Sequence, residues 1–205
     1  MKKCLLTTAL SILVALIAVA CGDGEKEQSR ILDQSELQAI VTLDSEGLPW
    51  EISLLQEGPV SNADAAEQTS DPEQWLKDYE AWGRITGHQA NYYVQDSRTA
   101  IVLGADIYST ATGAADAWAA EREFLLSQPV NESPEETEVD GIGDQASVFH
   151  FEVDNPQSDS YVVFFRRDNV VAQAGIGGLQ GEISQEDAIA VARLLDERIQ
   201  SALDQ

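Results

Sequence analysis

The segment from Tyr161 to Ile176 limits the possible folds most, because it contains two strands joined by a turn of two residues. Tyr161–Arg167 and Val170–Ile176 are rich in the β-branched and aromatic residues that favour strands. Between them lie Asp168 and Asn169, which both tolerate the positive φ of a tight hairpin turn. Strands connected so closely are antiparallel. The chain is therefore expected to contain an antiparallel sheet.

Five further segments have strand character and extend this sheet. Arg84–Val94 and Thr99–Ser109 are long candidates on either side of a polar turn, and apolar and polar residues alternate along Ala146–Val153. Gln38–Leu43 and Trp50–Leu55 are weaker candidates, because they alternate less regularly. Together with the hairpin, these segments predict a sheet of six to seven strands.

Three segments have the features of amphipathic helices. In the first, Asp71 can cap the helix, Pro72 suits the first helical position and Gly83 follows the last turn. Ala114–Gln128 has an apolar stripe at helical spacing. The third helix starts at Ser184, which is followed three residues later by an acidic capping partner.

The order of these segments predicts an α+β fold in a single domain. Consecutive strands with short connections form an antiparallel sheet, and we expect about three helices that lie mainly on one of its faces. The polar segments Ser61–Ser70 and Asn131–Asp144 are expected to be loops. A chain of 205 residues is long enough for one such domain behind a leader.

Residues 1–20 have the features of a secretory signal. Lys2 and Lys3 give a positive start, an apolar run follows from Leu5 to Ile17, and small residues precede Cys21. A membrane anchor would need about 20 consecutive apolar residues. Only 17 residues separate Lys3 from Cys21, and they include two Thr and one Ser. A signal is therefore favoured over an uncleaved anchor.

Ala18-Val19-Ala20-Cys21 resembles the processing site of bacterial lipoprotein precursors, although that family prefers Leu at the position of Ala18. The resemblance implies that Cys21 receives a diacylglycerol, becomes the new N-terminus after cleavage, and carries fatty acids such as palmitate. Cleavage without lipid attachment is the main alternative, and an uncleaved anchor is the other.

The expected organisation is a signal peptide at residues 1–20, a lipidated cysteine with a flexible acidic tether at residues 21–35, and one α+β domain at residues 36–205. We expect this domain outside the cytoplasm, anchored by lipid to the cell membrane, or to the outer membrane in a diderm host. Both cysteines, Cys4 and Cys21, precede the domain, so it has no disulfide and no cysteine nucleophile or metal site.

The net charge excludes some partners. The chain has a net charge of −24; without Lys2 and Lys3 of the leader, 10 of the 12 basic residues remain against 36 acidic ones, which gives −26. Nucleic acids and anionic lipid headgroups are recognised through Lys and Arg, so we expect no nucleic-acid partner. A small molecule, a cation or a basic protein remains open as a partner. Solubility, or adaptation to a salty medium, is the simpler explanation of the charge.

No arrangement of residues typical of an enzyme is visible. His88 and His150 are the only histidines, and neither has metal-binding spacing or a G-x-S-x-G serine to activate. Gly175–Gly181 has part of a dinucleotide-binding pattern, but Gln180 stands where the third glycine is required. We therefore expect no catalytic residue, no metal and no cofactor. A carboxylate pair or a histidine buried in a cleft with a strongly shifted pKa would instead favour an enzyme.

Three other features allow both a structural and a functional explanation. Trp75 and Tyr79 could form a ligand cage, but they are expected to anchor the first predicted helix on the sheet. The acidic residues of Asn131–Asp144 could bind calcium, but their spacing is not that of an EF-hand, which favours a solvated loop. Arg166 and Arg167 could bind a carboxylate or a phosphate, although pairing with the chain's own carboxylates is preferred in so acidic a protein.

Gly143-Asp144-Gln145-Ala146 and the later VVFFRRDNVV resemble the C-terminal part of many uncharacterised extracytoplasmic lipoproteins and sensor-type domains. This resemblance implies a binding role and brings no catalytic residues. We therefore expect a ligand-binding or sensor-type module of the cell envelope. An accessory or structural interaction protein is the alternative, and an enzyme comes third. The side chains that we expect on the ligand face are Tyr92, Tyr93, Tyr108, Arg166 and Arg167.

Overall fold

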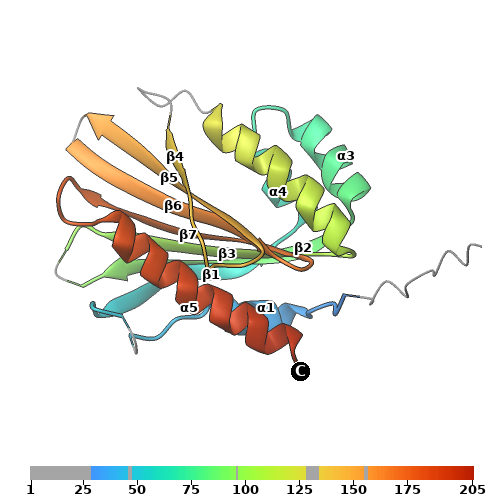
Figure 1. The fold of residues 1–205 in the computed structure, drawn as a ribbon, viewed down its shortest axis with the longest axis horizontal. Coiled ribbons are helices and arrows are strands. Elements are labelled where there is room, and N and C mark those ends of the chain that lie inside the picture. The colour runs from blue at the N-terminus through green and yellow to red at the C-terminus, as the bar shows by residue number, and fades with distance from the viewer. Residues whose placement is uncertain (1–28, 46–47, 96, 128–133, 155–156) are drawn as a thin grey trace, which may run out of the picture.

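A seven-stranded antiparallel sheet forms the middle layer of the protein (Figure 1). The computed structural model describes residues 29–45, 48–95, 97–127, 134–154 and 157–205. The order of the strands across the sheet is β1-β2-β3-β7-β6-β5-β4. The strands are β1 (Ile52–Val60), β2 (Arg84–Val94), β3 (Ala100–Tyr108), β4 (Glu135–Glu138), β5 (Gln145–Asp154), β6 (Gln157–Arg167) and β7 (Val170–Leu179).

In the described residues, five helices cover both faces of this sheet. α1 (Gln34–Val41) and α5 (Gln185–Leu203) lie side by side on one face, where α1 contacts β2 and β3, and α5 contacts β6 and β7 (Figure 1). α2 (Asn62–Glu67), α3 (Pro72–Trp82) and α4 (Ala111–Leu126) lie on the other face. The α+β class and the single domain are confirmed. The structure adds two helices to the three that we expected, and it divides the five between two faces rather than placing them mainly on one.

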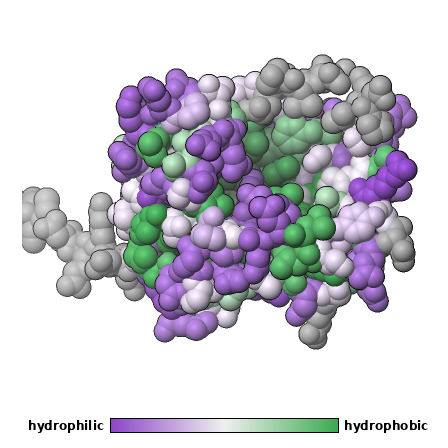
Figure 2. Space-filling view, turned by 180° about the vertical axis from the view of Figure 1, so that it is seen from behind, coloured by the Kyte–Doolittle hydropathy of each residue, from purple (hydrophilic) through white to green (hydrophobic). Residues whose placement is uncertain are grey.

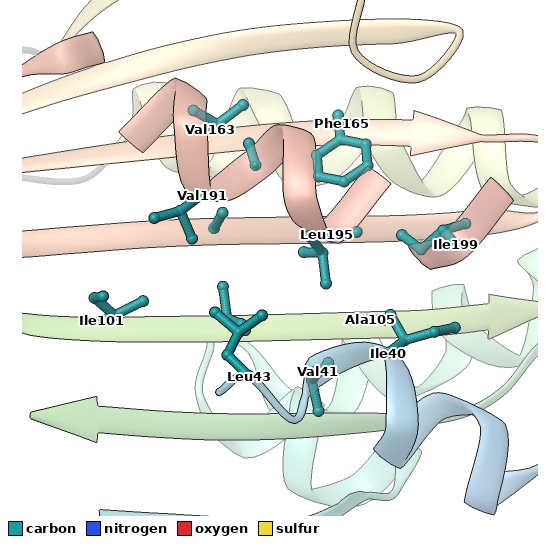
Figure 3. Packing of buried hydrophobic residues seen from close by; sticks show 14 of the residues in the cluster. Ile40, Val41, Leu43, Ile101, Ala105, Val163, Phe165, Val191, Leu195 and Ile199 are labelled. Carbon is teal, nitrogen blue, oxygen red and sulfur yellow. The ribbon is translucent and has the colours of Figure 1, made fainter. Parts of the chain in front are cut away.

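The larger hydrophobic core fills the space between the sheet and the pair α1 and α5 (Figure 3). Side chains alternate between the faces of a strand, so every second residue of β3 points into this core. Burial of each large apolar side chain stabilises the fold by roughly 1.5–3 kcal/mol. The buried residues labelled in Figure 3 are Ile40, Val41, Leu43, Ile101, Ala105, Val163, Phe165, Val191, Leu195 and Ile199.

A smaller core lies between α4 and the opposite face of the sheet. α4 contacts β3, β6 and β7, whereas α2 and α3 contact β1 and β2 near the other edge. This second layer covers the sheet unevenly and leaves a cavity, which is described below. The buried residues of the smaller core are Tyr108, Ala114, Ala117, Phe149, Phe164 and Val171.

Helix α1 shows that the strand expected at Gln38–Leu43 is wrong. Asp33 and Glu36 form a capping box, in which each side chain accepts a backbone N–H of the other residue. This box satisfies donors that the first turn of a helix leaves free. The apolar run that resembles a strand also fits the helical period, and the cap decides between the two. The residues that α1 buries are Leu37, Ile40 and Val41.

Two segments expected to be loops contain short elements. α2 lies within Ser61–Ser70, where Ser61 and Asp64 form a second capping box. β4 lies within Asn131–Asp144 and pairs with β5 at the edge of the sheet. Neither segment has an apolar face long enough to predict an element from its periodicity, so capping and strand pairing stabilise them instead.

Expected boundaries are confirmed where the chain carries strong local signals. The Asp71 side chain accepts a hydrogen bond from the backbone N–H of Gln74, and α3 ends at Gly83, whose φ of 74° is left-handed. Asp168, in the turn between β6 and β7, has a φ of 50°. Ser184 caps α5 as expected.

The leader at residues 1–20, Cys21 and most of the predicted tether lie outside the described residues. The predictions of a signal peptide and of lipid attachment therefore stay predictions. Among the helices that the structure describes, none is both long and apolar enough to cross a membrane.

We expect Tyr92→Phe to destabilise the fold by roughly 1–3 kcal/mol. The buried Tyr92 hydroxyl donates a hydrogen bond to the Val41 carbonyl at 2.8 Å and accepts one from the Leu43 N–H at 2.7 Å, so it ties the end of α1 to β2. Phenylalanine would leave both backbone groups without this partner. Urea unfolding at neutral pH measures the loss.

Tyr93→Phe is the matched control for this bridge. Tyr93 is the next residue along β2 and is 40% exposed, so loss of its hydroxyl should change the free energy of unfolding little. Equal stability of the two variants would contradict the role of the Tyr92 bridge.

Candidate functional site

A cavity of about 240 Å³ lies between the sheet and the helices α2, α3 and α4. Its floor comes mainly from β2, β3 and β7, and side chains of α3 and α4 form much of its wall. This face of the sheet is turned to the viewer in Figure 2, where apolar side chains line a hollow in a largely hydrophilic surface. The cavity has the volume of about eight liquid water molecules, which suits a small ligand.

Arg84 enters the cavity from the start of β2. The pairing of β2 with β3 shifts register between Arg84 and Thr86. Such a bulge changes the face to which a side chain points. Gly87 leaves room for the charged groups, since a Cβ atom there would lie only 1.8 Å from Asp106 Oδ1 and 2.7 Å from Arg84 Nη2. The bulge thus directs Arg84 to this face, and Gly87 leaves space for its contact with Asp106.

Arg84 and Asp106 form an ion pair at the cavity. Arg84 Nη2 donates a hydrogen bond to Asp106 Oδ1 at 2.8 Å. The guanidinium also donates to the Val60 carbonyl at 3.2 Å and to Asn62 Oδ1 at 2.8 Å. It lies over the ring of Tyr79, 5.2 Å from the centroid. Burial opposes the charged guanidinium, but Asp106 outweighs burial, so the pKa of Arg84 is raised and it stays a cation.

Glu121 of α4 is the second acid of the cavity. Its Oε1 accepts a long hydrogen bond of 3.4 Å from the Tyr108 hydroxyl. Dehydration by the surrounding protein raises the pKa of Glu121 to about 8; the negative charge of Asp106 adds to this effect, and the positive charge of Arg84 opposes it. Near neutral pH, Glu121 is therefore mostly protonated and can donate a hydrogen bond into the cavity.

Aromatic rings form one side of the cavity. Trp75 and Tyr79 of α3 lie with their ring centroids 5.6 Å apart, and Trp75 meets Phe124 of α4 edge to face at 5.4 Å. These rings hold α3 against α4, which is a structural role like the one expected for them, and they also line the cavity. Burial and nearby negative charge raise the pKa of Tyr79, so its hydroxyl stays protonated.

The cavity therefore combines one permanent cation, one carboxylate paired with it and one acid that is mostly neutral at pH 7. Side-chain amides of Gln68, Gln89 and Gln173 also line it. Such a set can hold a small polar ligand through charge and hydrogen bonds while the rings contact its apolar part. It can also hold or release a proton at Glu121.

The three tyrosines predicted on a ligand face are not brought together. Tyr92 is buried beneath α1, on the face opposite to the cavity. Tyr93 is exposed, and its hydroxyl bonds to the carbonyl of Ser97. Tyr108 is buried beside Glu121, at the edge of the cavity. A ligand role for these tyrosines stays a prediction, and Tyr108 contacts Glu121 of the cavity.

Arg166 and Arg167 are the other two residues predicted on a ligand face, and they pair with carboxylates of the chain. Arg166 lies 3.1 Å from Asp144, and Arg167 donates two hydrogen bonds to Asp196 of α5. This pairing agrees with the expectation for so acidic a protein. The two guanidinium groups have different partners and do not converge with the tyrosines. Their role in ligand binding also stays a prediction.

Both histidines point to the face that carries α1 and α5. His88 is buried, with Nδ1 2.6 Å from a side-chain amide of α1, and burial lowers its pKa. His150 stacks on Tyr161 and lies 3.3 Å from Asp159. In the part of the chain that the structure describes, one group could place three ligand atoms around a metal ion, and it consists of His150, Glu152 and Asp159.

The site residues predicted from the sequence do not include Arg84, Asp106 or Glu121, although the last two carry a signal. Ala114 and Ala117 are buried on α4, and Glu121 follows them at helical spacing. An acid on an apolar stripe indicates a buried carboxylate. Asp106 is likewise the only charged residue of β3. Arg84 gives no such signal, because the bulge that directs it is not visible in the sequence.

Comparisons with known proteins identify a shared fold. No protein-family model matches this chain, and no curated protein matches it in sequence. The extracellular domain of PknH from Mycobacterium tuberculosis is similar in structure, with a TM-score of 0.56 and 11% identity over 84% of this chain and 99% of that one. An uncharacterised protein of Mycobacterium smegmatis, the Rv0999 ortholog, has a TM-score of 0.39 at 12% identity, over 87% of this chain and 99% of that one. At these identities, the first likeness concerns the fold alone.

We expect Glu121→Gln to change the pH dependence of stability. The pKa of Glu121 in the folded protein, about 8, lies above its ordinary value of 4.5, so the folded state binds this proton more tightly than the unfolded state. The resulting stability is present below pH 4.5 and is lost as the pH rises to about 8, by at most about 1.4 kcal/mol per pH unit. The variant should therefore gain stability over the parent as the pH rises from 5 to 8.5, which urea unfolding measures.

Glu123→Gln is the control, because it removes the same charge from an exposed position of α4. Its difference in stability from the parent should change little over this range. If the stability of Glu121→Gln relative to the parent were also constant with pH, the pKa of Glu121 would not be raised in the folded state.

Proposed function

We propose that this protein is a ligand-binding module outside the cytoplasm, which holds a small molecule in the cavity between the sheet and helices α2, α3 and α4. The observation that carries this proposal is that one buried and two half-buried ionisable groups line an open space of ligand size. Arg84, Asp106 and Glu121 come from three different elements and meet at this space. The proposed ligand occupies the space and satisfies the polar groups around it.

A cavity lined by charged groups does not favour the stability of the fold, so its presence calls for another explanation. A cavity in a core forfeits packing energy, and a buried charge is held only with a partner and hydrogen bonds. Replacement of a buried ion pair by apolar side chains is often neutral or stabilising. The opposite face of the same sheet has such an apolar core. The polar cavity is thus better explained by binding than by folding.

The proposed location rests on the leader. We propose that Cys21 carries lipid and holds the domain at the outer side of a membrane, because small residues and a cysteine follow an apolar signal. The similarity in fold to an extracellular domain agrees with this location. The net charge of −26 behind the leader keeps the domain away from anionic headgroups, so the lipid rather than the domain would provide membrane binding.

Acid–base catalysis is a second candidate, because Asp106 and Glu121 place two carboxyl groups in one cavity and the pKa of Glu121 is strongly raised. A protonated acid and an ionised carboxylate in one cavity can act as general acid and base. Asp106, however, is held by Arg84 and would have to exchange that partner to act as a base. We therefore rank binding first, and stoichiometric retention of an unchanged ligand is the property that separates the two functions.

We expect a small molecule to remain bound when the protein is extracted from membranes of its own host in mild detergent. Native mass spectrometry should detect one added mass per chain, lost on unfolding. A stoichiometric protein partner instead would favour the accessory role. An empty chain, which also fails to retain any compound from a host metabolite extract, would contradict the proposed function.

We expect Cys21→Ala to abolish acyl labelling and to move the protein from the membrane fraction to the soluble extracytoplasmic fraction. Alanine has no thiol for lipid attachment, and one lipid anchor is the proposed link to the membrane. Cell fractionation and labelling with a palmitate analogue measure both effects. Cys4→Ala, within the leader, is the control and should keep label and location. Unchanged labelling of Cys21→Ala would show that the lipoprotein assignment is wrong.

A further inference from the structure

The charges of the cavity do not balance when both acids are ionised. Arg84 is the cation among the lining residues that the structure describes, and Asp106 and Glu121 are the acids. Arg84 already uses its guanidinium on Asp106, Asn62 and the Val60 carbonyl. No ion pair reaches Glu121 within the described part of the chain. One negative charge is therefore left without a counterion whenever Glu121 ionises.

The contacts of Arg84 show which groups of this cavity stabilise a positive charge. The guanidinium of Arg84 is held between a carboxylate, Asp106, and the face of an aromatic ring, Tyr79. Both contacts are favourable for a cation, and the attraction to the aromatic ring strengthens when water is excluded. Glu121 and the rings of Trp75 and Phe124 line the same space and repeat this combination of a carboxylate and aromatic rings.

Other classes of ligand match this space less well. An anion would have to displace Asp106 from Arg84 and would approach a domain whose net charge is strongly negative. A calcium ion needs six to eight oxygen ligands, whereas much of this wall is aromatic or aliphatic. A neutral ligand could use the amides and the protonated Glu121, but it would not use the negative charge that Glu121 can carry. An ammonium ion with a small apolar body uses both the carboxylate and the rings.

We propose that the ligand of this cavity is a small organic ammonium ion, held by the carboxylate of Glu121 and the aromatic rings of Trp75 and Phe124. This inference rests on the proposed binding function and names its ligand class. The volume of about 240 Å³ restricts the ion to a compact one. The excess negative charge of the domain raises the local concentration of such cations near the entrance.

Binding of this ion is coupled to the proton of Glu121. The groups that face Glu121 are Asp106 and Tyr108 of β3, Tyr79 of α3 and Arg84 of β2. Because the pKa of Glu121 is raised to about 8, the carboxyl proton must leave for solvent before the carboxylate can pair with the ammonium ion. One proton is released for each cation bound, and no covalent bond to the ligand forms. Affinity should therefore rise roughly tenfold per pH unit from pH 6 to pH 7.

The test compares ligands of one shape and different charge. Isothermal titration of the full-length protein in detergent uses choline, its uncharged carbon isostere 3,3-dimethylbutan-1-ol, and the anion 3,3-dimethylbutanoate. Tetramethylammonium and butylamine serve as further cations. We expect at least one cation to bind roughly tenfold or more tightly than the alcohol, with no binding of the anion. Titration in two buffers with different ionisation enthalpies should detect the released proton at pH 6.5.

Two variants connect this result to the cavity. Glu121→Gln should lose roughly tenfold or more in cation affinity, together with its pH dependence, and should bind the alcohol as the parent does. Glu123→Gln removes the same charge outside the cavity and should change neither value. Because Glu121→Gln is expected to be stable, loss of folding does not obscure the comparison.

Two outcomes separate this inference from the proposed function. If no cation binds more tightly than the alcohol, or if Glu121→Gln binds cations as well as the parent does, the ammonium assignment is wrong. A neutral or anionic molecule that remains bound in the host extract would overturn this assignment and leave the binding function intact. Absence of any ligand from both experiments would overturn both.

Discussion

Beneath α2 and α3, one guanidinium group connects elements that are distant in the sequence. Arg84, at the start of β2, reaches Asp106 on β3, the last carbonyl of β1 at Val60, and Asn62 at the start of α2, and it lies over Tyr79 of α3. A buried charge requires such partners, because dehydration without them is strongly unfavourable. The position of α2 and α3 above the sheet is therefore coupled to this group. The cavity is the space between these helices, α4 and the sheet.

The division between the two faces of the sheet explains how a polar cavity is compatible with a stable fold. β3 illustrates the division. Ile101 and Ala105 enter the apolar core under α1 and α5 (Figure 3), whereas Asp106 lines the cavity on the other face. Side chains alternate along a strand, so each face can be optimised separately. The apolar face holds the strands in register, and the other face is free to carry charge. Glu121 can then keep a raised pKa without loss of the fold.

Much of the fold is predictable because its signals are local. A turn at Asp168 and a cap at Asp71 specify a hairpin and a helix start from a few neighbouring residues. The strand expected at Gln38–Leu43 failed for the same reason: its short apolar run fits two periods, and the deciding cap at Asp33 lies five residues earlier. The distribution of helices over two faces was not predictable, because periodicity identifies an apolar stripe but not the face of the sheet that the stripe covers.

The site was less predictable than the fold because it depends on which face each residue occupies. Tyr92 and Tyr93 are neighbours in the sequence, yet one is enclosed under α1 and the other is exposed. Arg84 reaches the cavity only because the register of β2 shifts beside it. Glu121 was accessible to sequence reasoning, since it lies on the buried stripe of α4, but its partners come from β2 and β3. Glu121 has no ion-pair partner among the described residues, whereas Arg166 and Arg167 are paired with carboxylates of the chain. The carboxyl group without a counterion is therefore the better guide to the proposed function.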